Sequence, residues 1–146
     1  PAFSTYLAAQ IFMNDRSLLS GSSAVAHLIG TGDVHHIFPK KYLQQNGLDE
    51  KSLYNQVANY TYLDSTVNIA IGKKAPAEYF QDALKQCVDG QVRVGSILNE
   101  VDFWANLKAN CVPESILTMK AEDYIEFLVE RRKMMAQKIR SYYESL

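Results

Sequence analysis

Two adjacent histidines, His35 and His36, are the residues of this sequence with the clearest chemistry. A neutral imidazole can accept a proton from water near physiological pH, and it can also bind a divalent metal ion. The β-branched and aromatic residues of segment 34–38, between Gly32 and Pro39, predict a short strand around the pair. Successive side chains of a regular strand point to opposite faces. The two imidazoles can therefore share a site only where the strand is distorted beside a loop.

Two asparagines downstream complete the candidate site. Asn59 lies 23 residues after His36, at the start of a second predicted strand, and Asn68 lies nine residues further on, in a predicted short helix. A histidine pair alone is more often a surface feature or part of a core than a site. Downstream of the pair come a long loop, a strand and a short helix, with an asparagine in each of the last two. This order favours a functional site over a purely structural role for the histidine pair.

This order resembles the ββα-metal finger of the HNH (His-Me finger) endonucleases. The residues after the histidines, Ile37-Phe38-Pro39, are similar to the HHI-x-P signature of that family. The resemblance implies a finger over about residues 33–74. It also implies a divalent-metal-dependent endonuclease that hydrolyses DNA phosphodiester bonds, with nicking and low sequence specificity expected.

A closer resemblance is to the C-terminal nuclease half of GmrSD-type proteins, in which a ParB-like nucleotide-hydrolysing half acts as the sensor. It implies the cytoplasmic effector of a bacterial restriction or antiphage system. An N-terminal ParB-like sensor domain is then expected in the full-length protein, which agrees with a chain that opens at Pro1. The likeness covers about residues 5–146 and is clearest in segments 32–40, 55–60, 71–80 and 126–146.

The resemblance implies a role for each residue of the finger. His36 matches the general base, which takes a proton from the attacking water. His35 and Asn68 match the metal-binding positions, with Mg²⁺ expected first and Mn²⁺ or other transition ions also suited to a nitrogen ligand. Asn59 matches the middle asparagine, which supports the loop and helps to orient the base. Asp33 is either a partner that holds the tautomer of His35 or a turn residue.

Basic residues flank the candidate site, although the whole chain has a formal net charge of −1. Side chains within a few residues of Pro39 and Asn68 could either contact the phosphate backbone of DNA or remain solvated. A third basic run, residues 131–133, is interpreted as a solvated surface. The nucleic-acid-binding candidates are Lys40, Lys41, Lys73 and Lys74.

The elements that must position these residues are mostly helical. A long last helix is the clearest, because apolar residues recur at helical spacing over roughly 25 residues from Tyr124 onward, as in a helix with one core face. Residues 40–56 are polar and predict a long connection with a helical turn in it. The remaining predictions are helices over 6–13, 24–29, 66–71, 76–87 and 101–109, and strands over 34–38 and 60–63.

The composition suits one globular domain, residues 1–146, because 47% of the residues are hydrophobic and 21% are charged. We expect an α+β, mostly helical fold, with a small antiparallel β-hairpin and a short helix embedded in surrounding α-helices. Cys87 and Cys111 have no paired-ligand spacing, so they are expected as reduced, packed thiols. No apolar run is long enough to cross a bilayer.

Three alternatives remain open from the sequence. The chain could be a non-catalytic DNA-binding module of the same fold, although the presence of His36 argues against a degenerate site. It could be a toxin-like nuclease that cuts RNA, because the base and the metal ion act on any phosphodiester. Cleavage through the 2′ hydroxyl needs no metal ion, so sensitivity to a chelator separates the two mechanisms. A zinc knuckle of the two histidines and a cysteine is the weakest alternative.

Overall fold

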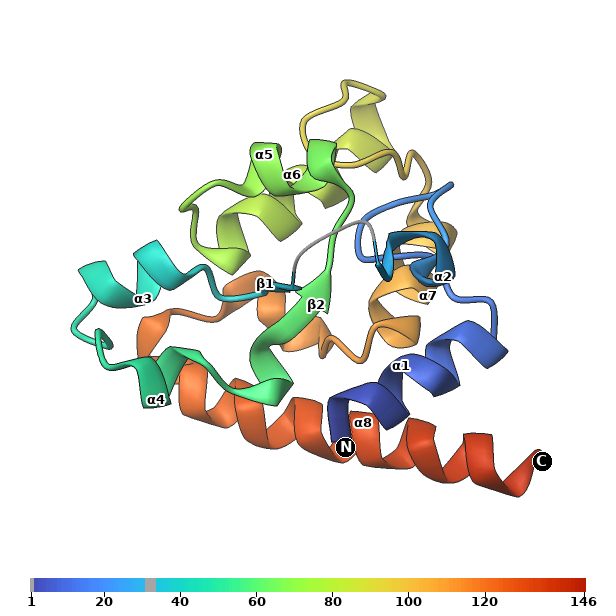
Figure 1. The fold of residues 1–146 in the computed structure, drawn as a ribbon. Helices are drawn as coiled ribbons and strands as arrows, with labels where there is room; N and C mark the ends of the chain where they lie inside the picture. Colours follow the sequence, from blue (N-terminus) through green and yellow to red (C-terminus); the bar gives the residue numbers. More distant parts are fainter. Residues whose placement is uncertain (1, 31–33) are drawn as a thin grey trace.

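The computed structural model describes residues 2–30 and 34–146, which fold into helices around one small antiparallel sheet (Figure 1). The predicted α+β, mostly helical class is confirmed. The elements in chain order are α1 (Ala2–Phe12), α2 (Val25–Leu28), β1 (Val34–His36), α3 (Lys40–Gln45), α4 (Lys51–Tyr54), the 3₁₀ turn η1 (Val57–Asn59), β2 (Tyr60–Tyr62), α5 (Ser65–Ile71), α6 (Pro76–Asp89), α7 (Glu100–Ala109), the 3₁₀ turns η2 (Glu114–Thr118) and η3 (Ala121–Asp123), and α8 (Tyr124–Glu144). None of the helices in the described part of the chain is long and apolar enough to span a membrane.

The predicted pairing of the two strands is confirmed, but both strands are shorter than predicted. β1 ends at His36, because the backbone of Phe38 bonds to the buried side chain of Asn59 instead of to a neighbouring strand. Pro39 follows and has no N–H to continue a ladder. The register pairs Val34 with Tyr62, His35 with Thr61 and His36 with Tyr60.

The connection over residues 40–56, predicted to contain a helical turn, holds two short helices, α3 and α4, and is therefore more helical than predicted. α3 starts directly after Pro39, whose carbonyl accepts a hydrogen bond from the amide of Leu43. Leu43 and Tyr54 are buried and fix one helix each against the core. Gly47 makes the turn between the two helices with a φ of +83°, which favours glycine.

The long helix α8 has the predicted core face, and it runs alongside α1 and the η1 turn (Figure 1). Arg131 belongs to this face and is completely buried, so the interpretation of residues 131–133 as a solvated surface was wrong for that residue. Its guanidinium donates to the carbonyl oxygens of Ala58 at 3.0 Å, Tyr60 at 2.7 Å and Asn110 at 3.2 Å. The hydrogen bonds of a fixed cation thus hold the backbone on both sides of Asn59.

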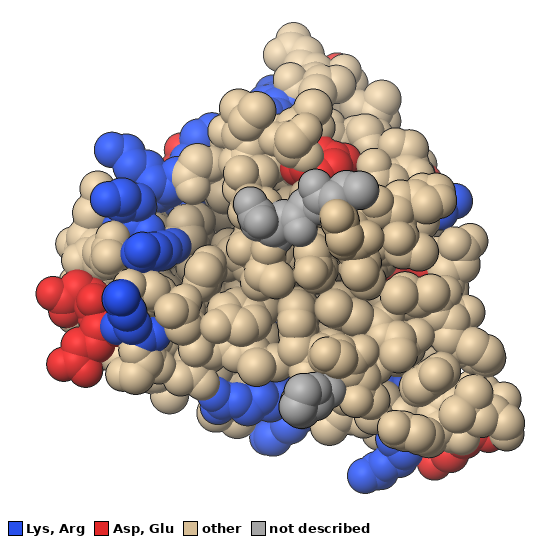
Figure 2. All heavy atoms as spheres, viewed as in Figure 1, with Lys and Arg blue, Asp and Glu red and all other residues tan. Residues whose placement is uncertain are grey.

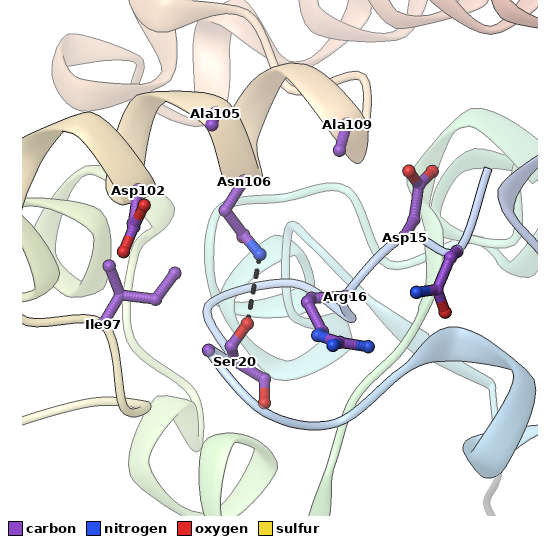
Figure 3. Close-up of a pocket in the computed structure, with 10 residues that line it drawn as sticks. Asp15, Arg16, Ser20, Ile97, Asp102, Ala105, Asn106 and Ala109 are labelled. Carbon is purple, nitrogen blue, oxygen red and sulfur yellow. Dashed lines mark hydrogen bonds between the residues drawn. The ribbon is translucent and has the colours of Figure 1, made fainter.

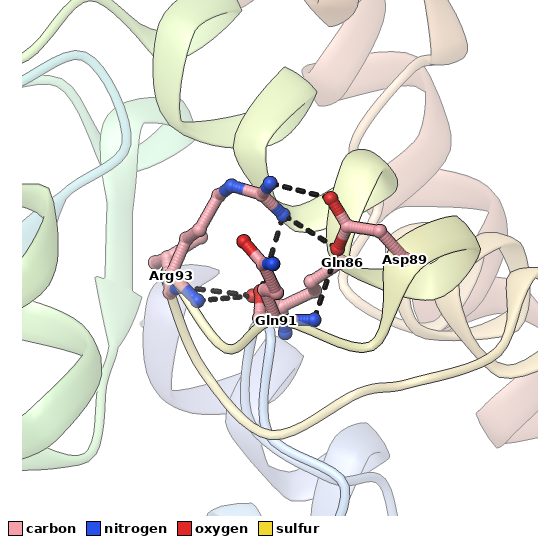
Figure 4. Close-up of polar contacts among 5 residues, drawn as sticks. Gln86, Asp89, Gln91 and Arg93 are labelled. Atoms are coloured by element: carbon pink, nitrogen blue, oxygen red, sulfur yellow. Dashed lines mark hydrogen bonds and ion pairs between the residues drawn. The ribbon is translucent and has the colours of Figure 1, made fainter.

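The segment after α6 is fixed by another buried polar side chain, that of Gln86 (Figure 4). Its amide oxygen accepts from the backbone amides of Arg93 at 2.8 Å and Val94 at 3.0 Å, and its nitrogen donates to the carbonyl of Ile97 at 2.9 Å. The exposed guanidinium of Arg93 also binds Asp89, and this hydrogen bond lowers the pKa of the Asp89 carboxyl to about 2. The loop after α6 is therefore held by hydrogen bonds from side chains and not by pairing with a β-strand.

Candidate functional site

A cavity of about 200 Å³ lies between β1, the start of α3 and α5, and several of the predicted site residues line it. The structure brings His35, His36 and Asn68 together at this cavity, as the sequence-based site required. Lys40 and Lys41 also line it. The complete set of described lining residues is His35, His36, Pro39, Lys40, Lys41, Leu63, Asn68, Ile71 and Gly72.

Both histidines are among the residues that line the cavity, and they are the last two residues of the three-residue strand β1. Each imidazole is half-buried. The ring of His36 packs edge-on against two tyrosine rings, Tyr60 at a centroid distance of 5.5 Å and Tyr54 at 6.2 Å. The two histidines thus border the same cavity although they are neighbours on one strand.

Asn59 is fully buried and acts as a strut between β1 and α4. Its side-chain oxygen accepts from the amide of Phe38 at 2.8 Å, and its nitrogen donates to the carbonyls of Phe38 at 3.1 Å and Tyr54 at 3.3 Å. The Asn59 carbonyl accepts from the amide of Ile37 at 2.9 Å. Asn59 is not one of the described lining residues, so its contribution to the site is to hold the backbone next to it.

Asn68 is carried by α5, which begins with a strong N-terminal cap. The carboxylate of Asp64 accepts from the amide of Val67 at 3.1 Å and from the hydroxyl of Thr66 at 2.7 Å. Burial raises the pKa of Asp64, but these hydrogen bonds outweigh it and hold the pKa below its ordinary value. Gly72 ends the helix with a φ of +53° and its amide donates to the Asn68 carbonyl, so both ends of the short helix are fixed.

His36 has a side-chain partner that was not predicted from the sequence. The Nε2 atom of His36 lies 2.9 Å from the side-chain oxygen of Asn55, at the end of α4. The contact crosses 19 residues of chain, and no spacing rule connects a strand residue to an asparagine after a one-turn helix. Arg131 was missed too, although its position four residues after Phe127 and four before Met135 places it on the apolar face of α8.

Positive charge dominates the rim of the cavity. Lys40 and Lys41 are exposed at its edge, and none of the described lining residues is acidic. Lys73 and Lys74 are exposed directly after Gly72 but do not line the cavity. Figure 2 shows basic side chains gathered over the region of α3 and the α5–α6 turn, with acidic side chains beside them near the α3–α4 connection.

The donor set defines what kind of cation could bind. In residues 2–30 and 34–146, no three His, Cys, Asp or Glu side chains gather into a metal-binding group. An ion at the cavity would take one imidazole nitrogen from His35 and one amide oxygen from Asn68, with water and a bound anion completing its coordination. Asp33, the predicted partner of His35, lies outside the described residues.

A second cavity, of about 330 Å³, lies between the loop after α1 and α7 and holds none of the predicted site residues (Figure 3). The side chain of Asn106 is one of several polar groups that line it. Its nitrogen donates to the carbonyls of Ser17 at 3.0 Å and Ser20 at 3.3 Å, and its oxygen accepts from the amide of Leu19 at 2.7 Å. These bonds occupy the amide with backbone groups, so this cavity reflects how the loop is anchored.

Comparisons with known proteins leave the function to be argued from this geometry. The chain matches no family model, no curated protein and no solved structure.

Proposed function

We propose that this chain is a divalent-metal-dependent endonuclease domain that hydrolyses phosphodiester bonds of DNA. The observation that carries the proposal is the convergence of His35, His36 and Asn68 on one cavity with two lysines at its edge. A strand pair followed by a short helix presents these side chains, in the order that resembles the ββα-metal finger of HNH endonucleases.

His36 is the general base in this proposal. It takes a proton from a water molecule, whose oxygen forms a new bond to phosphorus as the bond from phosphorus to the 3′ oxygen breaks. The 3′ oxygen leaves in line and takes a proton from solvent. The products therefore carry a 5′ phosphate and a 3′ hydroxyl.

His35 and Asn68 would hold the divalent ion, Mg²⁺ or Mn²⁺. When bound, the ion would act as a Lewis acid and would stabilise the negative charge that develops during cleavage. Both protein ligands are neutral and two lysines stand nearby, so the described side chains do not attract a cation by charge. A DNA phosphate supplies the missing negative charge, and we expect weak metal binding in its absence.

Lys40 and Lys41 would bind the DNA backbone on either side of the cleaved bond, with Lys73 and Lys74 extending the contact. The formal net charge of −1 means that this attraction is local to the site. Such contacts read no sequence, which supports low specificity. By its resemblance to GmrSD-type proteins, the domain would act in the cytoplasm as the effector of a restriction or antiphage system, directed by a ParB-like sensor domain.

The deciding experiment is cleavage of supercoiled plasmid by the purified chain with Mg²⁺, Mn²⁺ or a chelator. We expect nicked circles with either metal ion, none with the chelator, and none for His36→Ala. His27→Ala is the matched control, since it removes an imidazole from α2 and should cut like the wild type. DNA binding without nicking at any metal concentration would make the chain a binding module and refute the proposal.

Two further readouts separate the roles and the substrates. His35→Ala and Asn68→Ala should regain part of their activity at higher Mn²⁺, whereas His36→Ala should not, because added metal cannot replace a proton acceptor. An identical response of all three variants would show that the base and the ligands are misassigned. RNA products with 2′,3′-cyclic ends, formed in the presence of chelator, would identify the RNA-cutting alternative.

A further inference from the structure

We infer that Asn55 is a positioning residue for His36, whose imidazole it fixes in the tautomer with the proton on Nε2. This inference rests on the proposed role of His36 as general base. Its starting point is the distance of 2.9 Å between His36 Nε2 and the side-chain oxygen of Asn55. Asn55 is exposed and is not among the described residues that line the cavity.

The hydrogen bond determines which ring nitrogen can act as a base. A neutral imidazole has one N–H and one lone pair, and an amide oxygen can only accept. Nε2 must therefore be the donor in this contact, which leaves the lone pair on Nδ1. The partner of one ring nitrogen thus sets the chemistry of the other. In the proposed reaction, Nδ1 is the atom that receives the proton of the attacking water.

The contact is preorganised because both of its ends are tied to the same buried strut. Asn59 bonds to the backbone of Phe38, two residues after His36, and to the carbonyl of Tyr54, the residue before Asn55. The amide of Asn55 also donates to the carbonyl of Lys51 at 2.9 Å, which closes the end of α4. The separation of the two side chains is therefore set by the core and does not depend on bound DNA.

The packing around His36 opposes the alternative orientation of its ring. Tyr60 meets the imidazole at an interplanar angle of 87° and Tyr54 at 69°, so two aromatic rings flank it. Turning the ring over would exchange its edges and would lose the bond to Asn55. The same contacts therefore fix both the orientation and the tautomer of the His36 imidazole. An effective general base needs both to be fixed.

Nuclear magnetic resonance of the ¹⁵N-labelled, metal-free chain tests the tautomer directly. At about pH 9, where imidazoles are neutral, long-range ¹H–¹⁵N correlations identify the protonated ring nitrogen. We expect His36 to carry its proton on Nε2 in the wild type and in Asn55→Asp, which keeps an acceptor. Asn55→Leu should shift His36 toward a mixture of tautomers, while the His27 signals stay unchanged. Asn46→Leu is the matched control, because Asn46 is exposed and bonds only locally, to the Tyr42 carbonyl.

Plasmid nicking supplies the kinetic test. Asn55→Leu should lower kcat about five- to tenfold with little change in KM, the loss expected for one neutral hydrogen bond. Asn46→Leu should leave both constants unchanged. A wild-type proton on Nδ1, an unchanged tautomer in Asn55→Leu, or a failure of Asn55→Asp to keep the Nε2–H form would each overturn the inference.

The failure of the inference and that of the proposed function are distinguishable. If the chain nicks DNA through His36 but Asn55→Leu keeps its tautomer and its kcat, the positioning role alone is wrong. If the wild type shows the Nε2–H form and never nicks DNA, the nuclease proposal fails, and Asn55 has no catalytic base to position.

Discussion

Replacing Arg131 by methionine tests whether a buried cation holds the segment from Ala58 to Tyr60 against α8. The side chain is completely buried, and its guanidinium also lies 5.7 Å from the centre of the Tyr6 ring. Methionine fills much of the space of the arginine stem, so the variant removes the donors without opening a large cavity. The three carbonyl oxygens of Ala58, Tyr60 and Asn110 lose their bonds to the guanidinium.

The size of the effect follows from two opposing terms. Each buried carbonyl left without a donor costs about 1–3 kcal/mol, which gives a gross loss on the order of 3–9 kcal/mol for the three. The folded state no longer has to desolvate a guanidinium, which returns several kcal/mol. We therefore expect Arg131→Met to lower the free energy of unfolding by about 3 kcal/mol. For a chain of this size that corresponds to a fall in Tm of roughly 6–12 °C.

Urea denaturation followed by circular dichroism measures this difference, and Arg132→Met is the matched control. Arg132 is the next residue, is exposed, and bonds to the Gln56 side-chain oxygen at 3.0 Å. Its replacement should change stability by no more than about 0.5 kcal/mol. If the two methionine variants are equally stable, the bonds of Arg131 to the backbone contribute nothing net and the reasoning is refuted.

Asp64→Ala should cost about 1 kcal/mol at pH 7 through loss of the α5 cap. Because the pKa of Asp64 is lowered in the folded state, its charge stabilises the fold at pH values above the ordinary pKa of 3.8. The difference in unfolding free energy between the wild type and Asp64→Ala should therefore shrink as the pH falls below that value. A difference that does not change with pH would contradict this explanation. Asn59→Ala should cost about 2–4 kcal/mol in urea titrations, because the polar backbone groups that it bonds stay buried; a near-neutral effect would exclude the strut. Lys40→Ala with Lys41→Ala should flatten the plot of log Kobs for DNA against log salt by about 0.9 per lost phosphate contact, measured by fluorescence anisotropy, and an unchanged slope would remove these lysines from the interface.

Much of the order of β1, β2 and α5 could be predicted from the local sequence pattern. The β-branched and aromatic residues before Pro39 and around Thr61 favour strands, and Gly72 marks the end of α5, so the strand, strand and helix order is readable. Helices α3 and α4 were not predicted because they have six and four residues, too few for a helical period to stand out. Their positions depend on the burial of single residues, Leu43 and Tyr54, in a core formed by distant segments.

The residues of the candidate site and one of their supports, Asn59, were predicted, whereas two other supports, Asn55 and Arg131, were not. Spacing and resemblance selected His35, His36 and Asn68, and these line one cavity. Asn55 was missed because its contact depends on where α4 ends in space. Arg131 was predicted to be solvated because it is charged, although its helical spacing placed it on the apolar face. A guanidinium can be buried where backbone carbonyl oxygens accept its hydrogen bonds.

The strut formed by Asn59 has a consequence for how this domain tolerates change. It bonds the backbone beside His36 and Asn55 from the buried side, whereas the side chains of Lys40 and Lys73 are exposed. Variation at exposed lysines can therefore alter the charge around the cavity while the bonds of Asn59 stay in place. Libraries randomised at the lysines should retain correctly aligned members in abundance, while a library at Asn59 should retain almost none. The domain is divided into a fixed inner frame and an exchangeable rim.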